Sequence, residues 1–523
     1  MKKLMTWALV ATFAIAGSAI AQGHRFVAQP NATFAFGGPA TTNNDDSCDI
    51  STAPAATLLL PYFEVDFNSA QTTARTTLFT ITNTSPYPQI AHVVIWTDWS
   101  FPALDFNIFL TGYDVQSINL WDVLNRGIIA PSSVPGVGGT SSDTDVPVNP
   151  GANADPFDND ENPNITDTSA CSGSQLPGQI PTNLLTDLRL VLTTGRGTNT
   201  GIPCTSTVGG THANAVGYIT VDVAPSCNTS LPNDPTYAAA NLLFDNVLIG
   251  DYQDVNPNPT TGNFAGGNPM VHIRAVPEGG PAGSALVPAT NLPYTFYSRY
   301  ETGAQIGIDR RQPLPSVFAA RYIQGGPGAF NTNYKIWREG NTAGTCTTAS
   351  GNANLGASEI IRFDEHENAN VGGGSLVISP LPPAGGIPET GSYATTNPIF
   401  PAGPTSGDLA GWMYLNLNIP GVGGAPLSNV TAGRVPALPA RPANGAPASQ
   451  NWVIVSMSAE GRYAVDFDAA WLGNGCSGSV LAGSPVGPVG SATLSTPPMA
   501  GTLVCPAGIV CPVYPTIGSN QTP

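Results

Sequence analysis

Short apolar runs with a period close to two are the main feature of the chain beyond its first fifty residues. β-Branched and aromatic residues dominate these runs, and Asn, Ser, Pro and Gly separate them. This alternation is typical of β-strands with one buried face. Between residues 53 and 125 it predicts five short antiparallel strands, at 56–67, 74–85, 91–99, 104–110 and 115–120.

The same pattern returns in the second half of the chain. It predicts strands at 215–223, 246–255, 270–276, 294–301, 316–323, 334–340, 358–367 and 411–419. The last predicted element is a hairpin over 451–472 that turns at Glu460-Gly461. We therefore expect strands along most of the ordered chain.

Helical periodicity is rare. Residues 181–194 are the best helix candidate, with Thr182 or Asn183 as the N-cap. The apolar face of this helix would carry Leu184, Leu185, Leu188 and Val191. Residues 120–127 predict one or two further helical turns, closed by Gly127.

These elements predict an all-β protein with immunoglobulin-like or related β-sandwich cores, long Gly/Pro-rich loops and few short helices. The 58 Gly and 50 Pro among 523 residues exceed the usual share of about 12% and favour turn-rich connections. The expected organisation is a signal peptide (1–21), an N-terminal β-sandwich-like region (22–130), an acidic Gly/Pro-rich linker or loop (131–181), a second β-rich region with one short helix (182–370), a Gly/Pro/Ala-rich insertion with one strand (371–450), a terminal β-hairpin (451–476) and a flexible, disulfide-containing tail (477–523).

The first 21 residues have the pattern of a secretory signal. Lys2 and Lys3 precede an apolar segment, and Ala19-Ile20-Ala21 provides a small-x-small cleavage site. The apolar segment is too short for a membrane span, and no second one follows it. We therefore expect a secreted protein, extracellular or periplasmic, that starts at Gln22 and has no membrane span.

Acidic residues outnumber basic ones. The chain has 35 Asp and Glu against 18 Lys and Arg, for a formal net charge of −17. Loss of Lys2 and Lys3 with the signal makes the charge more negative and leaves Lys335 as the single lysine. A chain of this charge without a basic run repels phosphate backbones, which excludes nucleic acid as a partner.

The cysteines suggest structural cross-links. An even number in an oxidising compartment favours four disulfides, formed among Cys48, Cys171, Cys204, Cys227, Cys346, Cys476, Cys505 and Cys511. Two pairs are plausible from local sequence, Cys204 with Cys227 and Cys505 with Cys511. The other pairings stay open.

Several of the predicted strands, taken together, resemble those of a known group of proteins. "PAATLLLPYFEVD", "AHVVIWTDWSFPALDFNIFLTGYDVQSINL" and "MSAEGRYAVDFDA" resemble large exported bacterial β-rich proteins of unassigned function. The resemblance covers mainly residues 53–125, 215–340 and 451–470. It implies export and an all-β fold, and it brings no catalytic residue with it.

Glu64 and Asp66 are the first candidates for chemistry. They lie two positions apart in the strand "LLLPYFEVDF", so their Cα atoms are about 6.5–7 Å apart on one face. That spacing does not exclude a glycosidase pair, whose carboxyl groups are held about 5–5.5 or 6.5–9.5 Å apart. The simpler interpretation is an amphipathic strand, with Phe63, Val65 and Phe67 in the core and Tyr62, Glu64, Asp66 and Asn68 in solvent.

A second candidate is a ligand-binding surface formed by acidic and aromatic residues. It would consist of Trp96, Asp98, Trp99, Asp105 and Tyr113. Exposed rings can stack on sugars while carboxylates accept hydrogen bonds from their hydroxyl groups. The alternative, which we favour, places both tryptophans in the sandwich core and the aspartates in turns.

The acidic segment "DPFDNDENPNITD" is the best candidate for a metal site. Its hard oxygen donors suit Ca²⁺ and are Asp155, Asp158, Asp160, Asn162 and Asp167. The spacing starts like an EF-hand loop, but Pro163 occupies the position that needs Gly. A solvated acidic linker is the alternative.

The chain has no complete catalytic constellation, since GxSxG, HExxH and CxxC motifs are all absent. The sequence therefore favours an exported, non-enzymatic β-protein with a structural or adhesive role at the cell surface or in the extracellular matrix. Its partners would be surface, matrix or glycan components. The alternative is a secreted carbohydrate-binding or carbohydrate-active protein that uses carboxylates and Trp on a β-sheet face.

Overall fold

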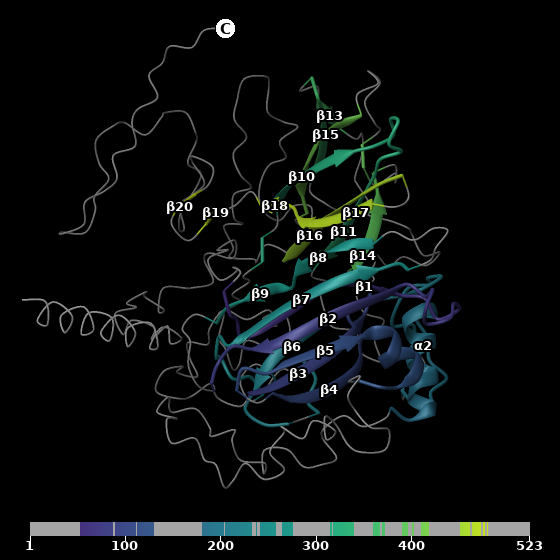
Figure 1. Ribbon diagram of the computed structural model, residues 1–523, viewed down its shortest axis with the longest axis vertical. Coiled ribbons are helices and arrows are strands. Elements are labelled where there is room, and N and C mark those ends of the chain that lie inside the picture. The colour runs from purple at the N-terminus through teal and green to yellow at the C-terminus, as the bar shows by residue number, and fades with distance from the viewer. Residues whose placement is uncertain are drawn as a thin grey trace, which may run out of the picture.

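The computed structural model describes less than half of the chain, between Ala53 and Ser479. The described residues are 53–86, 89–110, 112–129, 180–202, 204, 206–227, 229–232, 237, 241–257, 264–275, 314–315, 317–338, 359–366, 369–371, 390–395, 400–401, 409–417, 450–460, 463–471, 474–475 and 478–479. Within these ranges the protein is built mainly from antiparallel β-strands with few helices (Figure 1). The predicted all-β class is confirmed.

Three large sheets contain most of the strands. Sheet I has the order β4 (Pro102–Leu110), β3 (Gln89–Thr97), β6 (Ala215–Ala224), β1 (Thr57–Val65) and β9 (Val271–Ile273). Sheet II has the order β14 (Thr390–Ala394), β11 (Asn331–Arg338), β16 (Asn451–Ala459), β17 (Tyr463–Asp468), β8 (Phe264–Pro269), β7 (Leu248–Val255), β2 (Thr76–Asn83) and β5 (Val115–Asn119). Sheet III has the order β13 (Ala369–Val371), β12 (Glu359–Asp364), β15 (Ala410–Asn416), β10 (Val317–Ile323) and β18 (Ala470–Trp471).

A short pair, β19 (Asn474–Gly475) with β20 (Gly478–Ser479), completes the described strands. Neighbouring strands pair antiparallel, except β17 and β8, which meet in parallel at Tyr463 and Phe264. This parallel contact joins the two halves of sheet II. Sheet II therefore contains strands from residue 76 to residue 468.

The five strands predicted between residues 53 and 125 are all present, but they belong to two sheets. β1, β3 and β4 lie in sheet I, whereas β2 and β5 lie in sheet II. β6, from far along the chain, lies between β3 and β1. Only β3 and β4 pair as consecutive strands, so the arrangement depends on pairings between distant segments.

In Figure 1, sheet III lies at the top, β11, β16 and β17 of sheet II lie below it, and β7, β2 and β5 of sheet II overlap with sheet I. β1 of sheet I packs against β2, β7 and β11 of sheet II, and β10 of sheet III packs against β11 and β16. One continuous hydrophobic core includes residues of all three sheets, among them Phe63, Tyr252 and Phe318. A smaller cluster of Ile361, Tyr414 and Phe363 lies on the other face of sheet III.

The described helices agree with the sequence pattern except at one end. α2 (Thr182–Thr194) buries Leu188 and Val191 and packs against β4 and β6. The predicted N-cap is wrong, because Pro181 occupies that position and Thr182 is already helical. η3 (Asp122–Arg126) ends at Gly127, as predicted, and the φ of Gly127, 72°, is left-handed. Neither helix in the described part of the chain is long and apolar enough to cross a membrane.

Candidate functional site

The predicted solvent face of β1 is not in solvent. Tyr62 is only 4% exposed, and most of β1 is buried on both faces. β1 is an inner strand of sheet I, one of whose faces packs against sheet II, and its pairing with β6 shifts between Leu60 and Phe63. Pro61 lies at this shift and has no N–H to donate to the ladder. Within β1 the amphipathic interpretation is therefore wrong, because sheet II covers the face of Tyr62 and Glu64, whereas Asn68, beyond the end of the strand, is exposed as expected.

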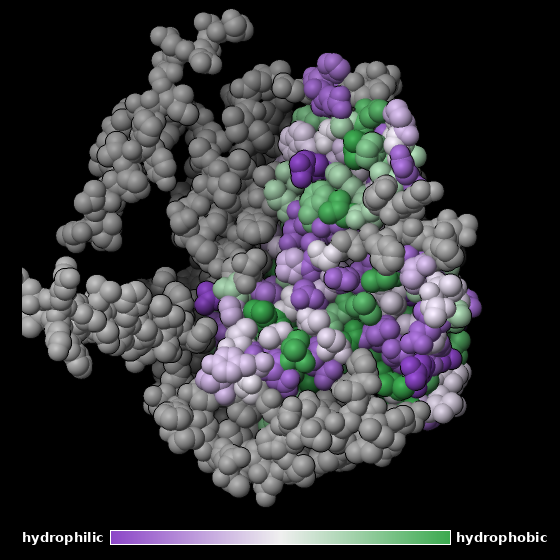
Figure 2. All heavy atoms as spheres, in the orientation of Figure 1, coloured by the Kyte–Doolittle hydropathy of each residue, from purple (hydrophilic) through white to green (hydrophobic). Residues whose placement is uncertain are grey.

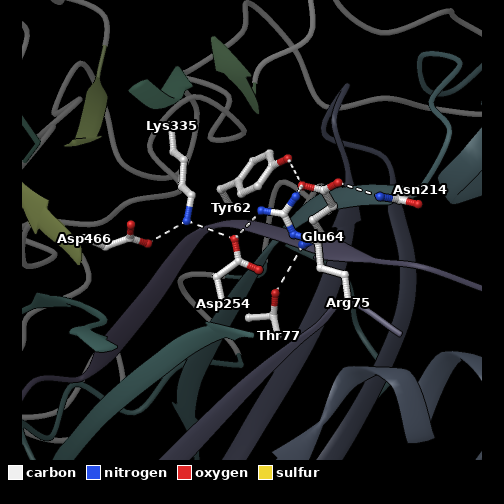
Figure 3. Close-up of polar contacts among 8 residues, drawn as sticks. All are labelled: Tyr62, Glu64, Arg75, Thr77, Asn214, Asp254, Lys335 and Asp466. Carbon is white, nitrogen blue, oxygen red and sulfur yellow. Dashed lines mark hydrogen bonds and ion pairs between the residues drawn. The ribbon is translucent and has the colours of Figure 1, made fainter. Parts of the chain in front are cut away.

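Glu64 is held by three neighbouring side chains (Figure 3). Its Oε2 accepts a hydrogen bond from the Tyr62 hydroxyl at 3.0 Å and forms an ion pair with Arg75 Nη1 at 2.8 Å. Its Oε1 accepts a hydrogen bond from Asn214 Nδ2 at 2.6 Å. Both carboxylate oxygens therefore have partners within the protein.

Arg75 extends this contact into a chain of charges. Its Nη2 lies 3.1 Å from Asp254 Oδ2, and Lys335 Nζ lies 3.0 Å from the same oxygen (Figure 3). Lys335 Nζ also lies 2.6 Å from Asp466 Oδ2. We call Glu64, Arg75, Asp254, Lys335 and Asp466 the ion network. It connects β1 in sheet I to β7, β11 and β17 in sheet II.

Burial sets the electrostatics of the ion network. Burial lowers the pKa of Lys335, but the charges of Asp254 and Asp466 outweigh this effect and raise it. Burial raises the pKa of Asp254, but Lys335 and Arg75 outweigh that effect and lower it. Three carboxylates face two cations, and the Oδ1 atoms of Asp254 and Asp466 are buried without a hydrogen-bond partner. The network is strongly paired but not neutral.

Asp66 has a separate local role. Its Oδ1 accepts a hydrogen bond from the backbone N–H of Asn68 at 2.8 Å, and its own N–H donates to the carbonyl oxygen of Arg75 at 2.9 Å. This is the geometry of a turn between β1 and β2. The Glu64 carboxylate therefore belongs to the ion network, whereas the Asp66 carboxylate stabilises the turn between β1 and β2.

A second buried carboxylate, Asp98, is paired with a histidine. His212 Nε2 lies 2.7 Å from Asp98 Oδ2, and the N–H of Gly210 donates to Asp98 Oδ1 at 2.9 Å. Burial lowers the pKa of His212, but the hydrogen bond and charge of Asp98 outweigh it and raise the pKa, with a smaller contribution from Glu64. A Cβ atom on Gly210 would lie 2.7 Å from the Asp98 carboxylate, so this contact requires glycine. No local pattern in the sequence pointed to His212.

The tryptophans of the predicted ligand surface are buried. Trp96 stacks on Tyr218 with ring centroids 5.5 Å apart and donates to Thr220 Oγ1 at 2.9 Å. Trp99 is also buried, which leaves neither ring available to a ligand, as the favoured core interpretation expected. Tyr113 is 70% exposed.

Asp105 belongs to the same set of candidates and lies on β4. Burial raises the pKa of Asp105 to about 6. The five predicted surface residues therefore do not form one exposed face.

Another polar cluster lies within sheet I. Asp222 accepts hydrogen bonds from Thr57 Oγ1 at 2.6 Å and from the Tyr237 hydroxyl at 3.0 Å. His92, opposite Asp222 in the β3–β6 ladder, lies with its Nδ1 2.9 Å from Asn107 Oδ1. Burial lowers the pKa of His92, which favours a neutral ring. The local sequence pattern predicted the strand that contains Asp222 but not the polar role of Asp222 within it.

Exposed aromatic surface occurs on sheet III instead. Trp412 on β15 is 38% exposed and stacks on Phe363 of β12, with ring centroids 4.5 Å apart and planes 12° apart. The ladders place Arg321 of β10 beside Trp412 in the same row. Figure 2 shows apolar surface over the part of the molecule that contains β10 and β15. We call Arg321, Phe363 and Trp412 the aromatic row.

Several predicted sites lie outside the described residues. These are the calcium candidates Asp155, Asp158, Asp160, Asn162 and Asp167 and the cysteines Cys48, Cys171, Cys346, Cys476, Cys505 and Cys511. Cys204 and Cys227 are buried and neither is a free thiol, while their pairing with each other stays a prediction. In the described ranges no group of three or more His, Cys, Asp or Glu side chains could hold a metal ion.

Comparison with known proteins assigns no family. No family model, no curated protein and no solved structure matches the chain. The fold and the polar clusters define an antiparallel all-β protein whose layers are connected by buried charges. Function has to be argued from these residues.

Proposed function

We propose that the protein is an exported, non-enzymatic β-protein with a structural or adhesive role at the cell surface or in the extracellular matrix. The observation that carries this proposal is the state of Glu64, whose two oxygens are occupied by Tyr62, Arg75 and Asn214. A general acid or base must be able to reach the proton that it transfers. Glu64 instead connects sheet I to sheet II.

The other buried carboxylates support the same proposal. Asp254 and Asp466 are paired with Lys335, and Asp98 is paired with His212. Charges held in this way restrict the sheets to one arrangement, which suits a protein that bears load or presents a surface. The predicted secretion signal, the predicted disulfides and an immunoglobulin-like relationship of the sandwiches are parts of this proposal.

The test is turnover by the purified, secreted protein on common polysaccharides, peptides and esters. We expect no turnover, together with measurable binding to cells or matrix preparations. Glu64→Gln and Asp66→Asn form a matched pair of variants, because Glu64 is in the ion network and Asp66 is in a turn. Hydrolysis by the wild type that is lost in either variant would overturn the proposal.

A carbohydrate-binding role is the second candidate, and the aromatic row is the observation that favours it. Flat, partly exposed rings on a β-sheet can stack on the apolar face of a sugar, and Arg321 can donate to its hydroxyl groups. This site differs from the one that the sequence suggested around Trp96.

Tryptophan fluorescence titrated with a polysaccharide panel tests the second candidate. Binding through the aromatic row predicts a saturable change that Trp412→Ala abolishes and Tyr113→Ala leaves intact. Tyr113 is a suitable control because it is an exposed aromatic residue between β4 and β5, far from β15 in sequence. A flat response across the panel would rule against this candidate.

Calcium binding by the segment from Asp155 to Asp167 is a separate proposal. Five oxygen donors on an acidic segment support it. The melting temperature measured with calcium and with chelator tests it. We expect a higher value with calcium, and equal values would remove the metal from the proposal.

A further inference from the structure

Lys335 is unusual in both the sequence and the structure. The chain has fifteen arginines, but beyond the predicted signal peptide it has a single lysine. That lysine is not on the surface; it is 2% exposed and lies between two aspartates. An arginine would serve a purely structural ion pair better, because guanidinium is more weakly hydrated and offers more donors. Lysine differs from arginine in that its amine can act as a nucleophile.

We propose that Lys335 and Asp466 become joined by an intramolecular isopeptide bond, formed by the folded protein itself with Asp254 relaying the protons. The proposal concerns the covalent structure of the chain and does not depend on the proposed function.

The distances favour Asp466 as the acceptor. Lys335 Nζ is 2.6 Å from Asp466 Oδ2, which places the nitrogen next to the Cγ atom that carries this oxygen (Figure 3). Asp254 Oδ2 is farther away, at 3.0 Å, and also accepts from Arg75. Two cations hold Asp254 as a carboxylate, which is a poor electrophile. Of the two cations in the ion network, Asp466 pairs only with Lys335, while the Oδ1 atoms of both aspartates are buried without a partner.

The surroundings exclude water from the reacting groups. Lys335, Asp254 and Asp466 are each at most 4% exposed, and Lys335 Nζ lies 5.7 Å from the centre of the Tyr62 ring. Amide formation from an amine and an acid is unfavourable in bulk water, where hydrolysis competes. A dry site that holds both groups in contact can supply an effective concentration on the order of 10⁵ M or more.

The reaction needs no external reagent. Asp254 takes one proton from the Lys335 ammonium and passes it to Asp466 Oδ2, so that Asp466 becomes the neutral acid and Lys335 the neutral amine. The amine lone pair attacks Asp466 Cγ, the Cγ–Oδ2 bond breaks, and the leaving hydroxyl takes a second proton from the same nitrogen to become water. The products are a neutral secondary amide and one water molecule, and Asp254 ends as the carboxylate that it was at the start.

The bond would cross-link sheet II at a specific place. Lys335 is on β11 and Asp466 is on β17, and β16 pairs with both strands. Lys335 is opposite Ile454 of β16, and Asp466 is opposite Ser456 two positions along, so both side chains lie on the same face. A covalent bridge over β16 would prevent separation of the three strands.

Intact-protein mass spectrometry of the secreted, fully reduced wild type tests the proposal directly. We expect a mass below that of the processed sequence by one water molecule, and a proteolytic peptide in which segments containing residues 335 and 466 are joined. The unmodified mass would overturn the proposal, and so would a cross-link that maps to residue 254.

Two variants sharpen the test. Lys335→Arg keeps the charge but cannot form the amide, so it should have the full mass of its own sequence. Asp466→Asn should react with loss of ammonia and reach the same final mass as the wild type, because both routes give one product. An Asp466→Asn protein that folds, by circular dichroism, yet keeps its unreacted mass would contradict the assigned acceptor.

The Asp254→Asn variant tests the role of Asp254 in proton transfer separately from the existence of the isopeptide bond. It leaves Lys335 and Asp466 in place and should form the cross-link at least tenfold more slowly than the wild type. Equal rates would remove Asp254 from the mechanism. If a variant does not fold, the mass of the wild type alone decides whether the bond exists.

Discussion

Asp105 shows how a single carboxylate can cost stability. It lies on β4, and burial raises its pKa from 3.8 to about 6. The folded state therefore holds the proton to a higher pH than the unfolded state does. Folding stability falls as pH rises from about 4 to about 6, and the ionised group stays unfavourable at neutral pH.

We predict that Asp105→Asn stabilises the protein by about 1–3 kcal/mol at pH 7, because a shift of about two pKa units corresponds to at most about 3 kcal/mol. The gain should vanish below about pH 4, where the unfolded chain also holds the proton. Urea unfolding at a series of pH values measures both effects. Asp251→Asn is the control, since Asp251 is exposed on β7 and should change stability little. A gain that is equal at pH 4 and pH 7 would contradict burial of charge as the cause.

Two carboxylates that look alike in the sequence have different partners in the structure. Glu64 and Asp66 lie two positions apart, yet Glu64 pairs with Arg75 while Asp66 accepts from a backbone N–H. Period-two alternation predicts that they share a face. Alternation does not predict what covers that face. Arg75 contacts Glu64 because β2, which follows Arg75, belongs to sheet II and not to the sheet of β1.

Among the elements, β6 determines how sheet I is assembled. It pairs with β1 on one side and β3 on the other. Gly217 of β6 leaves no room for a side chain, because a Cβ atom there would be 2.0 Å from the Trp96 carbonyl oxygen and 2.8 Å from the Phe63 ring. Backbone cannot move away from such a contact without breaking the ladder. The position therefore accepts glycine only.

We predict that Gly217→Ala destabilises the protein by about 1–3 kcal/mol or more, the range for overpacking a core. Thermal and urea unfolding measure the loss. Gly267→Ala on β8 is the matched control, since its Cβ would meet the flexible Gln253 side chain at 3.2 Å. Equal effects of the two substitutions would mean that loss of glycine flexibility, and not the contact with Trp96, governs the result.

The strands themselves were predictable from local pattern to a large extent. All five strands before residue 125 occur, as do β6, β7, β9, β10, β11, β12, β15, β16 and β17. β8, β13 and β14 were missed because they are short and lie in Gly/Pro-rich sequence without clear alternation. The strand predicted at 294–301 lies outside the described residues.

For the whole molecule, sheet II is the element that couples early and late parts of the chain. β2 and β7 in one half contact β1, and β11 and β16 in the other half contact β10. The halves meet at β17 and β8, next to the ion network. Loss of the last strands would therefore expose the edges of both halves.

We predict that a chain ending at residue 450, which lacks β16, β17 and β18, loses cooperative unfolding. A chain ending at residue 479 keeps every described strand and should unfold like the full-length protein. Far-ultraviolet circular dichroism and tryptophan fluorescence during urea unfolding compare them. A native-like, coincident transition in the shorter chain would show that the N-terminal strands fold without the second half of sheet II.

Local pattern was enough to predict most strand positions, the all-β class, the helix at 182–194 and the burial of Trp96, because these depend on alternation and composition within a few residues. Which strands pair, which faces are covered and which charges meet depend on segments far apart in the chain. Arg75 and Asp254, or Asp98 and His212, are more than a hundred positions apart. These contacts form beside the paired strands β2 and β7 and the paired strands β3 and β6, and local periodicity carries no information about which distant strand pairs with which.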